Sequence, residues 1–134
     1  MANPNIVNVT SIYGNTAYVI PSTTSATTSW TYNGTTSLTG LTPAAGSVHR
    51  ITSIVVANTT SSAATATVGV GNNATFGSAT VISYPAYQIS VPANTTLIIT
   101  DKTTSLYITE NQSVGVTSGT ASALTYTATF EIIT

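Results

Sequence analysis

The clearest hydrophobic pattern in the chain is a strict two-residue alternation over residues 124–132. Because side chains alternate between the two faces of a β-strand, this pattern predicts a strand with one buried face and one face toward water. The inward set would be Leu124, Tyr126, Ala128, Phe130 and Ile132, and the outward set Thr125, Thr127, Thr129 and Glu131. We expect this strand to be paired inside a sheet and to close the hydrophobic core.

Residues 48–58 form a second strong apolar run, and they carry apolar residues on both faces. One face would hold Ile51, Val55 and Ala57, and the other Ile54 and Val56. This predicts a central strand covered on both sides. Residues 63–70 alternate again, and we expect them to form a hairpin with 48–58 across the turn 58–62. Their inward side chains would be Ala64, Ala66, Val68 and Val70.

Shorter apolar runs predict further strands between turn-forming residues. They cover residues 5–13, 17–20, 30–32, 87–91, 97–99, 106–108 and 114–116. Gly14-Asn15 and Asn33-Gly34 read as turns, the second as a tight hairpin pair. Residues 34–47 and 71–85 are predicted to be irregular connections. In 87–91, Tyr87, Ile89 and Val91 would share a face.

The fold class follows from these runs and from the absence of a helical pattern. No window shows the 3.6-residue apolar period of an amphipathic helix. Short strands at a spacing of roughly 8–12 residues predict an all-β, antiparallel β-sandwich of about eight strands, jelly-roll or immunoglobulin-like. The 134 residues suit one domain. We divide the chain into an N-terminal strand or arm, 1–14, and a sandwich domain, 15–134. The arm would either be covered within the domain or pair with a neighbouring subunit by strand addition.

Charge is the unusual feature of the composition, because charged residues make up 4% of the chain against about 25% in ordinary proteins. They are Arg50, Asp101, Lys102, Glu110 and Glu131. With so little repulsion between copies, we expect neighbours in an assembly to cover much of the surface. The alternative is a polar β domain that tolerates low charge.

Composition also argues against several function classes. Two basic residues are too few to neutralise a phosphate backbone, so we expect no nucleic-acid partner. The apolar runs are too short for a membrane-spanning helix, and we expect no membrane partner. The N-terminal residues lack the basic and apolar regions of a classical signal peptide. No cysteine is present to form disulfides or thiolate metal sites.

The chemically active residue types form no convincing constellation. His49 is the single histidine, and we expect it to make ordinary hydrogen bonds at a strand start rather than to bind a metal. Arg50 is a candidate partner for Glu110, Glu131 or Asp101. Asp101 and Glu110 would need a fixed separation and a sugar-binding cleft to act as glycosidase carboxylates. We therefore expect no catalytic residue, no cofactor, no metal and no enzymatic activity.

Four aromatic residues are candidates for a binding surface: Trp30, Tyr32, Tyr84 and Tyr87. Such side chains can stack on sugars or anchor a protein partner. Trp30 and Tyr32 would share one face of a strand. Because aromatic residues are enriched in cores and at subunit interfaces, packing there is favoured over a sugar platform.

Three segments carry a resemblance to a known group of proteins. They are residues 1–14, residues 50–58 (RITSIVVAN) and residues 90–133. The most telling parts are SVPANTTLII at 90–99, LYITE at 106–110 and YTATFEI at 126–132. Together they resemble small virion structural proteins of tailed phages, especially phages that infect marine cyanobacteria.

This resemblance implies a non-enzymatic β-sandwich displayed in many copies on a virion. Its most concrete form is a capsid decoration, or cement, protein on the capsid surface, made in the host cytoplasm, that bridges major capsid subunits. The implied partners are the major capsid protein and copies of itself, as a trimer.

The chain departs from those relatives in two places. It has one acidic residue, Glu110, in the segment 106–113 where they carry more, and residues 22–47 form a Thr-rich, aromatic insertion. These departures leave the position on the particle open. The alternative is a neck-, tail- or fibre-associated virion protein that binds host-surface glycans, with Trp30 and Tyr32 stacking on the sugar.

Overall fold

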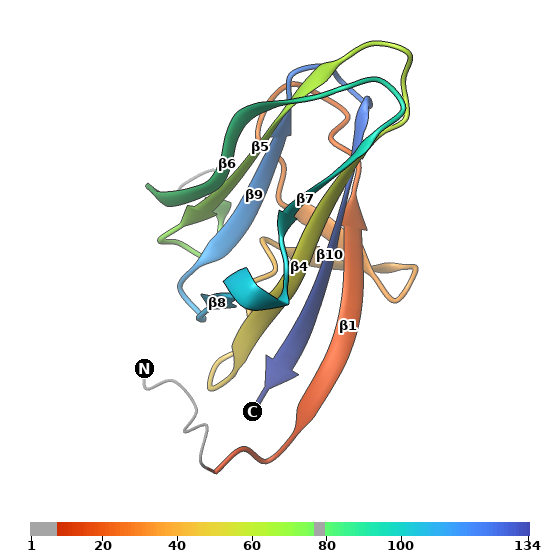
Figure 1. Cartoon of the computed structure of the whole chain (residues 1–134). Helices are drawn as coiled ribbons and strands as arrows, with labels where there is room; N and C mark the ends of the chain where they lie inside the picture. The colour runs from red at the N-terminus through yellow and green to blue at the C-terminus, as the bar shows by residue number, and fades with distance from the viewer. Residues whose placement is uncertain (1–7, 77–79) are drawn as a thin grey trace.

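The protein folds into two antiparallel β-sheets packed face to face, as Figure 1 shows for the computed structural model. The structure describes residues 8–76 and 80–134, which contain ten strands and the 3-10 turn η2 (Lys102–Thr104), but no α-helix. The strands are β1 (Ile12–Val19), β2 (Ser29–Tyr32), β3 (Thr36–Thr39), β4 (Val48–Asn58), β5 (Ala64–Gly71), β6 (Val81–Val91), β7 (Thr96–Thr100), β8 (Leu106–Ile108), β9 (Ser113–Ser118) and β10 (Leu124–Ile133). The predicted antiparallel β-sandwich is confirmed.

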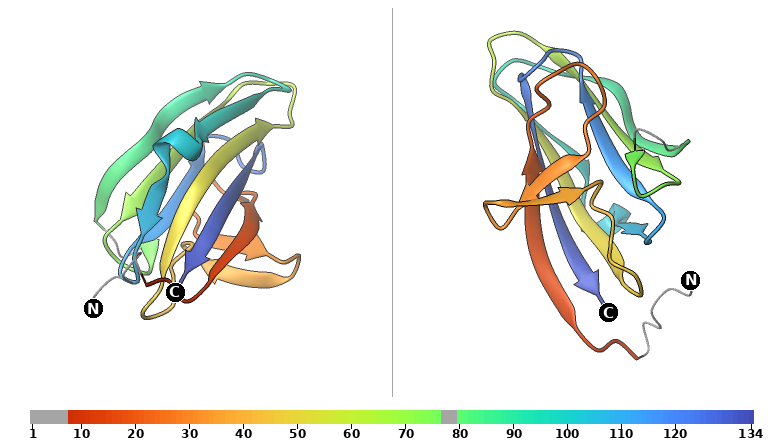
Figure 2. Two further views of the ribbon diagram at one scale, coloured as in Figure 1. Left: turned by 60° about the horizontal axis from the view of Figure 1, so that its bottom comes forward. Right: turned by 180° about the vertical axis from the view of Figure 1, so that it is seen from behind.

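The larger sheet has the strand order β3-β2-β1-β10-β4-β7, and β8 also pairs with β4. The smaller sheet has the order β6-β5-β9. Figure 2 shows the two sheets from two further directions, with the β2–β3 hairpin projecting beside β1. The core lies between the sheets, where packing of apolar side chains supplies the main stabilising free energy.

The largest fully buried side chains are Trp30, Tyr126 and Phe130. Two of them also satisfy their polar atoms across the core. Trp30 Nε1 donates to the backbone oxygen of Val114 at 3.1 Å, and the Tyr126 hydroxyl donates to the backbone oxygen of Thr117 at 2.7 Å. Both acceptors lie on β9, so each hydrogen bond joins the larger sheet to the smaller one. Burial raises the pKa of Tyr126.

The predicted closing strand is confirmed as β10, which pairs with β1 on one side and β4 on the other. Its inward residues Leu124, Tyr126, Ala128 and Phe130 are fully buried. The alternation fails only at the end of the strand, where Ile132 is half-buried and Ile133 is buried.

β4 contains an extra residue, Thr52, that the sequence pattern does not reveal. In the pairing with β10, its neighbours Ile51 and Ser53 both have partners and Thr52 has none. The Thr52 hydroxyl instead donates to the backbone oxygen of Thr129 at 3.0 Å. A β-bulge of this kind reverses the alternation beyond it. Ile51 therefore points into the core together with Ile54.

Two predictions about β4 are consequently wrong. Ile51 does not share a face with Val55 and Ala57, because the bulge lies between them. Val55 and Ala57 lie on the face turned away from the smaller sheet and are only half-buried. Among the described residues, the strand is therefore fully covered on one face rather than on both.

The predicted hairpin between 48–58 and 63–70 is also wrong. β4 pairs with β10, β7 and β8, whereas β5 pairs with β6 and β9 in the other sheet. Asn58 holds the crossing between the sheets: its Nδ2 donates to the backbone oxygens of Ser62 and Val91, each at 2.9 Å, and its Oδ1 accepts from the Thr60 N–H at 3.0 Å. The predicted inward residues of β5 are buried as expected.

The N-terminal predictions need correction as well. β1 runs without interruption through Gly14-Asn15, so no turn is present there, and of the described residues 8–13 only Ile12 and Tyr13 belong to a strand. Residues 1–7 of the predicted arm lie outside the described residues. The Thr10 N–H donates to the Thr134 oxygen at 2.6 Å, and β1 pairs with β10 of the same chain from Ile12 onward. The predicted division between residues 14 and 15 falls inside β1.

The stretch 34–47, predicted as a connection, contains β3. The predicted strand 30–32 is β2, and the predicted Asn33-Gly34 turn joins it to β3. Asn33 and Gly34 have φ of 52° and 78°, the left-handed conformation that such hairpin turns require.

The segment around this hairpin also covers the free edge of β9. Thr27 and Val116 exchange two backbone hydrogen bonds of 2.9 and 3.0 Å. The Val114 N–H donates to the Gly40 oxygen at 2.6 Å. We call residues 27–40 the edge strap, because they satisfy backbone groups that β9 would otherwise leave unpaired.

The remaining strands follow the pattern more closely. The predictions at 97–99, 106–108 and 114–116 are confirmed as β7, β8 and β9. The predicted strand 87–91 is the second half of β6, which begins at Val81, inside the stretch predicted to be irregular.

Candidate functional site

The charged and titratable candidates serve local structural roles. His49 is 3% exposed, and its Nδ1 lies 2.8 Å from the Leu41 backbone oxygen. Burial lowers its pKa, and the hydrogen bond to Leu41 opposes this in part. Its ring packs on Phe130 with centroids 5.0 Å apart. His49 thus makes the ordinary strand-start hydrogen bond that the sequence suggests.

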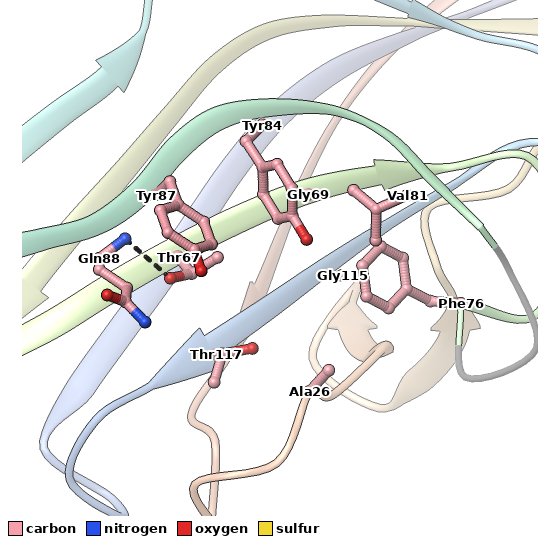
Figure 3. Close-up of a pocket in the computed structure, with 10 residues that line it drawn as sticks. All are labelled: Ala26, Thr67, Gly69, Phe76, Val81, Tyr84, Tyr87, Gln88, Gly115 and Thr117. Carbon is pink, nitrogen blue, oxygen red and sulfur yellow. Dashed lines mark hydrogen bonds between the residues drawn. The ribbon is translucent and has the colours of Figure 1, made fainter.

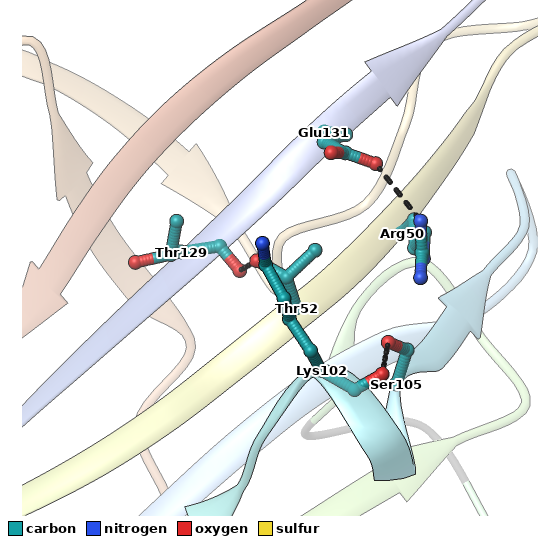
Figure 4. A network of polar contacts seen from close by, with 6 residues as sticks. All are labelled: Arg50, Thr52, Lys102, Ser105, Thr129 and Glu131. Atoms are coloured by element: carbon teal, nitrogen blue, oxygen red, sulfur yellow. Dashed lines mark hydrogen bonds and ion pairs between the residues drawn. The ribbon is translucent and has the colours of Figure 1, made fainter.

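Of the three carboxylates considered for Arg50, the structure places Glu131 beside it, at 3.5 Å between Nη1 and Oε2 (Figure 4). Asp101 instead begins η2, where its Oδ1 accepts from the Thr103 hydroxyl at 2.6 Å and from the Thr103 N–H at 2.8 Å. These bonds to Thr103 hold the pKa of Asp101 below its usual value. Asp101 is thus a turn-capping residue, as expected for a strand end.

Within residues 8–76 and 80–134, no three His, Cys, Asp or Glu side chains come close enough to hold a metal ion. No helix of the described chain is long and apolar enough to cross a membrane.

The four aromatic candidates separate into two pairs. Trp30 is fully buried, and Tyr32 packs against the core with its ring 6.5 Å from that of Phe130. Tyr84 and Tyr87 remain 49% and 59% exposed on β6, with ring centroids 4.9 Å apart in an edge-to-face arrangement. Of the predicted roles in core or interface packing, the structure shows core packing for Trp30 and Tyr32, whereas Tyr84 and Tyr87 lie outside the core and are the more exposed pair.

Tyr84 and Tyr87 stand beside a hollow of about 260 Å³ on the outer face of the smaller sheet (Figure 3). Gly69 of β5 and Gly115 of β9 are directly paired and form its floor. Phe76 lies over both glycines. A Cβ placed on Gly115 would come within 2.4 Å of the Phe76 ring, and one on Gly69 within 3.0 Å.

The wall of the hollow adds neutral polar groups. Thr67 and Thr117 project from the outward positions of β5 and β9, and Gln88 extends from β6 (Figure 3). The Gln88 N–H donates to the Thr67 hydroxyl oxygen at 3.0 Å. Gln88 has a φ of 48°, a conformation that non-glycine residues rarely adopt. The hollow thus combines aromatic rings, hydroxyls and an amide, and none of the described residues that line it is charged.

Irregular pairing of β6 with β5 explains why sequence reasoning missed this site. Tyr87 was predicted to share a face with Ile89 and Val91, but a register shift separates Ile89 from Ala86. Tyr87 consequently faces outward. A partial signal was present in the sequence, because Gly69 and Gly115 each lie between two valines at the outward position of a strand.

A second notable surface is the outer face of the larger sheet, on the opposite side of the molecule. One row of aligned residues crosses it through five strands, from Thr31 of β2 through Tyr18, Thr127 and Val55 to Ile98 of β7. Tyr18 is 43% exposed and Ile98 is 64% exposed. We call the outward positions of β1, β10, β4 and β7 the outer sheet face.

Comparison with known proteins gives no family for the chain: no protein-family model, curated protein or solved structure matches it.

Proposed function

We propose that the protein is a non-enzymatic structural component of a tailed-phage virion, a decoration protein that stabilises the capsid by bridging major capsid subunits. Two considerations support this proposal. The segments 1–14, 50–58 and 90–133 resemble small virion proteins of such phages, and the surface has few charges to keep neighbouring copies apart.

The observation that carries the proposal is the chemistry of the outer sheet face. Its central strand β10 presents Thr125, Thr127 and Thr129, and Glu131 is matched by Arg50 on β4. The two side chains of this ion pair are each 35% exposed, so the pair leaves little net charge on the face. A surface of low net charge with exposed apolar side chains at both margins is suited to contact with another protein.

The energetics of decoration suit such a face. A standard interface buries roughly 1,600 Å² in total. Each individual contact can be weak and still hold the protein on the shell, because a copy that bridges several subunits gains avidity. Hydroxyl groups on the threonines can hydrogen-bond to a partner without the desolvation penalty of buried charges.

The decisive experiment is to locate the protein on purified particles. We expect mass spectrometry and cryo-electron microscopy to find hundreds of copies on the capsid surface. A few tens of copies at one vertex would instead indicate a neck or tail component. Absence of the protein from purified particles would refute a virion role altogether.

A matched pair of variants tests the outer sheet face itself. Ile98→Lys places a charge at the margin of this face, and Ile82→Lys does the same at a 53% exposed position on the smaller sheet. Both variants should fold, because both side chains are exposed. We expect Ile98→Lys to reduce particle occupancy at least tenfold and Ile82→Lys to leave it unchanged. Equal occupancy of the two variants would show that this face does not contact the shell.

The alternative function, a glycan-binding module that stacks sugars on Trp30 and Tyr32, loses support from those residues. Trp30 is fully buried and its Nε1 is hydrogen-bonded to the backbone of β9. A sugar therefore cannot stack on it without opening the core.

A further inference from the structure

We propose that the hollow over Gly69 and Gly115 is a binding site for a neutral saccharide, with Tyr84 and Tyr87 as the aromatic contacts. This inference does not depend on a virion role. It concerns the outer face of the smaller sheet, whereas the proposed capsid contact uses the outer sheet face of the larger one.

The shape of β6 is the first argument. Between the pairs Ala66↔Ile89 and Val68↔Ala86, β6 contains one more residue than β5, and the same is true in each of the next two intervals along the strand. Extra residues of this kind re-aim side chains, and they are over-represented at sheet edges and next to active sites. Here they bring Tyr84 and Tyr87 to the same outer face. In a regular strand, two residues three positions apart would point to opposite faces.

The backbone at Gln88 is the second argument. Its left-handed conformation has an energetic cost, and such conformations cluster where side chains are held for function. A hydrogen bond of 3.0 Å from the Gln88 N–H to the Thr67 hydroxyl oxygen stabilises this conformation. As a result, the Gln88 amide and the Tyr87 ring are held at the rim of one hollow (Figure 3).

The floor of the hollow is the third argument. Paired glycines remove side-chain volume from the middle of the sheet, and the Phe76 ring covers part of that space. Glycine in a strand often marks a place where a ligand or another group approaches the backbone closely. The remaining hollow of about 260 Å³ is slightly smaller than the pockets of roughly 300–1,000 Å³ that hold drug-sized molecules. One or two sugar rings match this size better than an extended chain.

The chemistry of the lining selects the ligand class. Tyrosine and threonine hydroxyls can each donate and accept hydrogen bonds, and the Gln88 amide does both. Sugar hydroxyls need this mixture, and the apolar C–H faces of a sugar ring can pack on aromatic rings. Because no lysine or arginine is among the described residues that line the hollow, phosphate or carboxylate groups would find no charged partner among them. An uncharged saccharide therefore fits better than an anionic ligand.

The hollow is open to solvent, so we expect weak binding to a single site, with a Kd on the order of 1 mM. Display of the protein in many copies would raise the avidity for a surface that carries many sugars by about 10²–10⁴.

The test uses the full chain, labelled with ¹⁵N, and titration with glucose, galactose, mannose and N-acetylglucosamine. At least one of these sugars is expected to shift the amide resonances of Gly69, Gly115 and Gln88. Glucuronate, which carries a charge, should bind at least tenfold more weakly than the best neutral sugar. If none of the four neutral sugars shifts these amides at about 20 mM, well above the expected Kd, the proposal is wrong.

Two tyrosine variants provide the matched comparison. Tyr87→Ala removes one wall of the hollow, and Tyr107→Ala removes a similarly exposed tyrosine, 56% against 59%, on β8 of the other sheet. We expect Tyr87→Ala to weaken binding at least tenfold and Tyr107→Ala to leave it unchanged. Tyr87→Phe should retain most of the binding, which separates lost ring contact from altered folding. Equal losses in Tyr87→Ala and Tyr107→Ala would overturn the assignment to this hollow.

Discussion

Adding one methyl group at Gly115 is expected to destabilise the protein, although glycine is usually an unfavourable residue inside a strand. The new Cβ would lie 2.4 Å from Cδ1 and 2.5 Å from Cγ of Phe76, well inside van der Waals contact. The Phe76 ring would therefore have to leave its position over the sheet. Phe76 is 9% exposed, so its displacement would return most of its apolar surface to water.

The magnitude follows from two opposing contributions. Full burial of a phenylalanine side chain stabilises a fold by about 1.5–3 kcal/mol. Replacing glycine by alanine in a strand restores about 0.5–1 kcal/mol through the lower entropy of the unfolded chain. The net loss for Gly115→Ala should be about 1–2 kcal/mol. For a domain of this size we expect Tm to fall by about 3–8 °C.

Gly14→Ala is the matched control, because Gly14 also lies in a strand but no atom comes within 4 Å of a Cβ placed there. It should be neutral or stabilising by up to about 1 kcal/mol. Urea denaturation followed by tryptophan fluorescence suits the measurement, since Trp30 is the only tryptophan and is fully buried.

A double-mutant cycle identifies the cause of the loss. Once Phe76→Ala has removed the ring, Gly115→Ala should become neutral or slightly stabilising, and the two changes should differ from additivity by about 2 kcal/mol. An equal cost of Gly115→Ala with and without Phe76 would refute the claim that the ring excludes a side chain at this position.

Two further predictions concern the core. Trp30→Phe keeps an aromatic ring but leaves the Val114 oxygen without the indole N–H donor. We expect the free energy of unfolding to fall by about 1–3 kcal/mol, measured by urea denaturation followed by circular dichroism. An unchanged free energy of unfolding would contradict the role given to this hydrogen bond. Burial lowers the pKa of His49 below 6.5 in the folded state, so the unfolded state binds a proton first as the pH falls. The contribution of His49 to stability should therefore be full above about pH 6.5 and decrease as the pH drops through its lower folded pKa. His49→Gln should flatten the pH dependence of the free energy of unfolding between about pH 5 and 7. If His49→Gln leaves this pH dependence unchanged, the dependence comes from another group.

The sequence alone was sufficient for the fold class and for strands with regular alternation. β10 shows this best, because its period of two matches its burial up to Phe130. The failures occur where one extra residue changes the period. Thr52 is a bulge whose hydroxyl bonds to the backbone of Thr129, and nothing in a run of β-branched residues distinguishes such a threonine from its neighbours.

Pairing partners were also beyond the sequence pattern. β4 and β5 follow one another with a short turn between them, which usually indicates a hairpin. Asn58 instead fixes a crossing between sheets through bonds to Ser62 and Val91, and the second of these residues is far away in the sequence.

The candidate site was predicted only in part, for the same physical reason. Tyr84 and Tyr87 were recognised as possible binding residues, but their common orientation depends on the irregular register of β6. The glycine floor and Phe76 were missed because their contact joins three segments that are distant along the chain.

The edge strap has a consequence for how copies of this protein can associate. Residues 27–40 occupy the backbone groups of Val114 and Val116 at one margin of the smaller sheet, and at the other margin the irregular β6 lacks the even spacing that a partner strand would need. Addition of a strand from another copy is therefore disfavoured at both margins of the smaller sheet. Contacts through this sheet would then be made by side chains on its face, and its edges give little template for open-ended, edge-to-edge association.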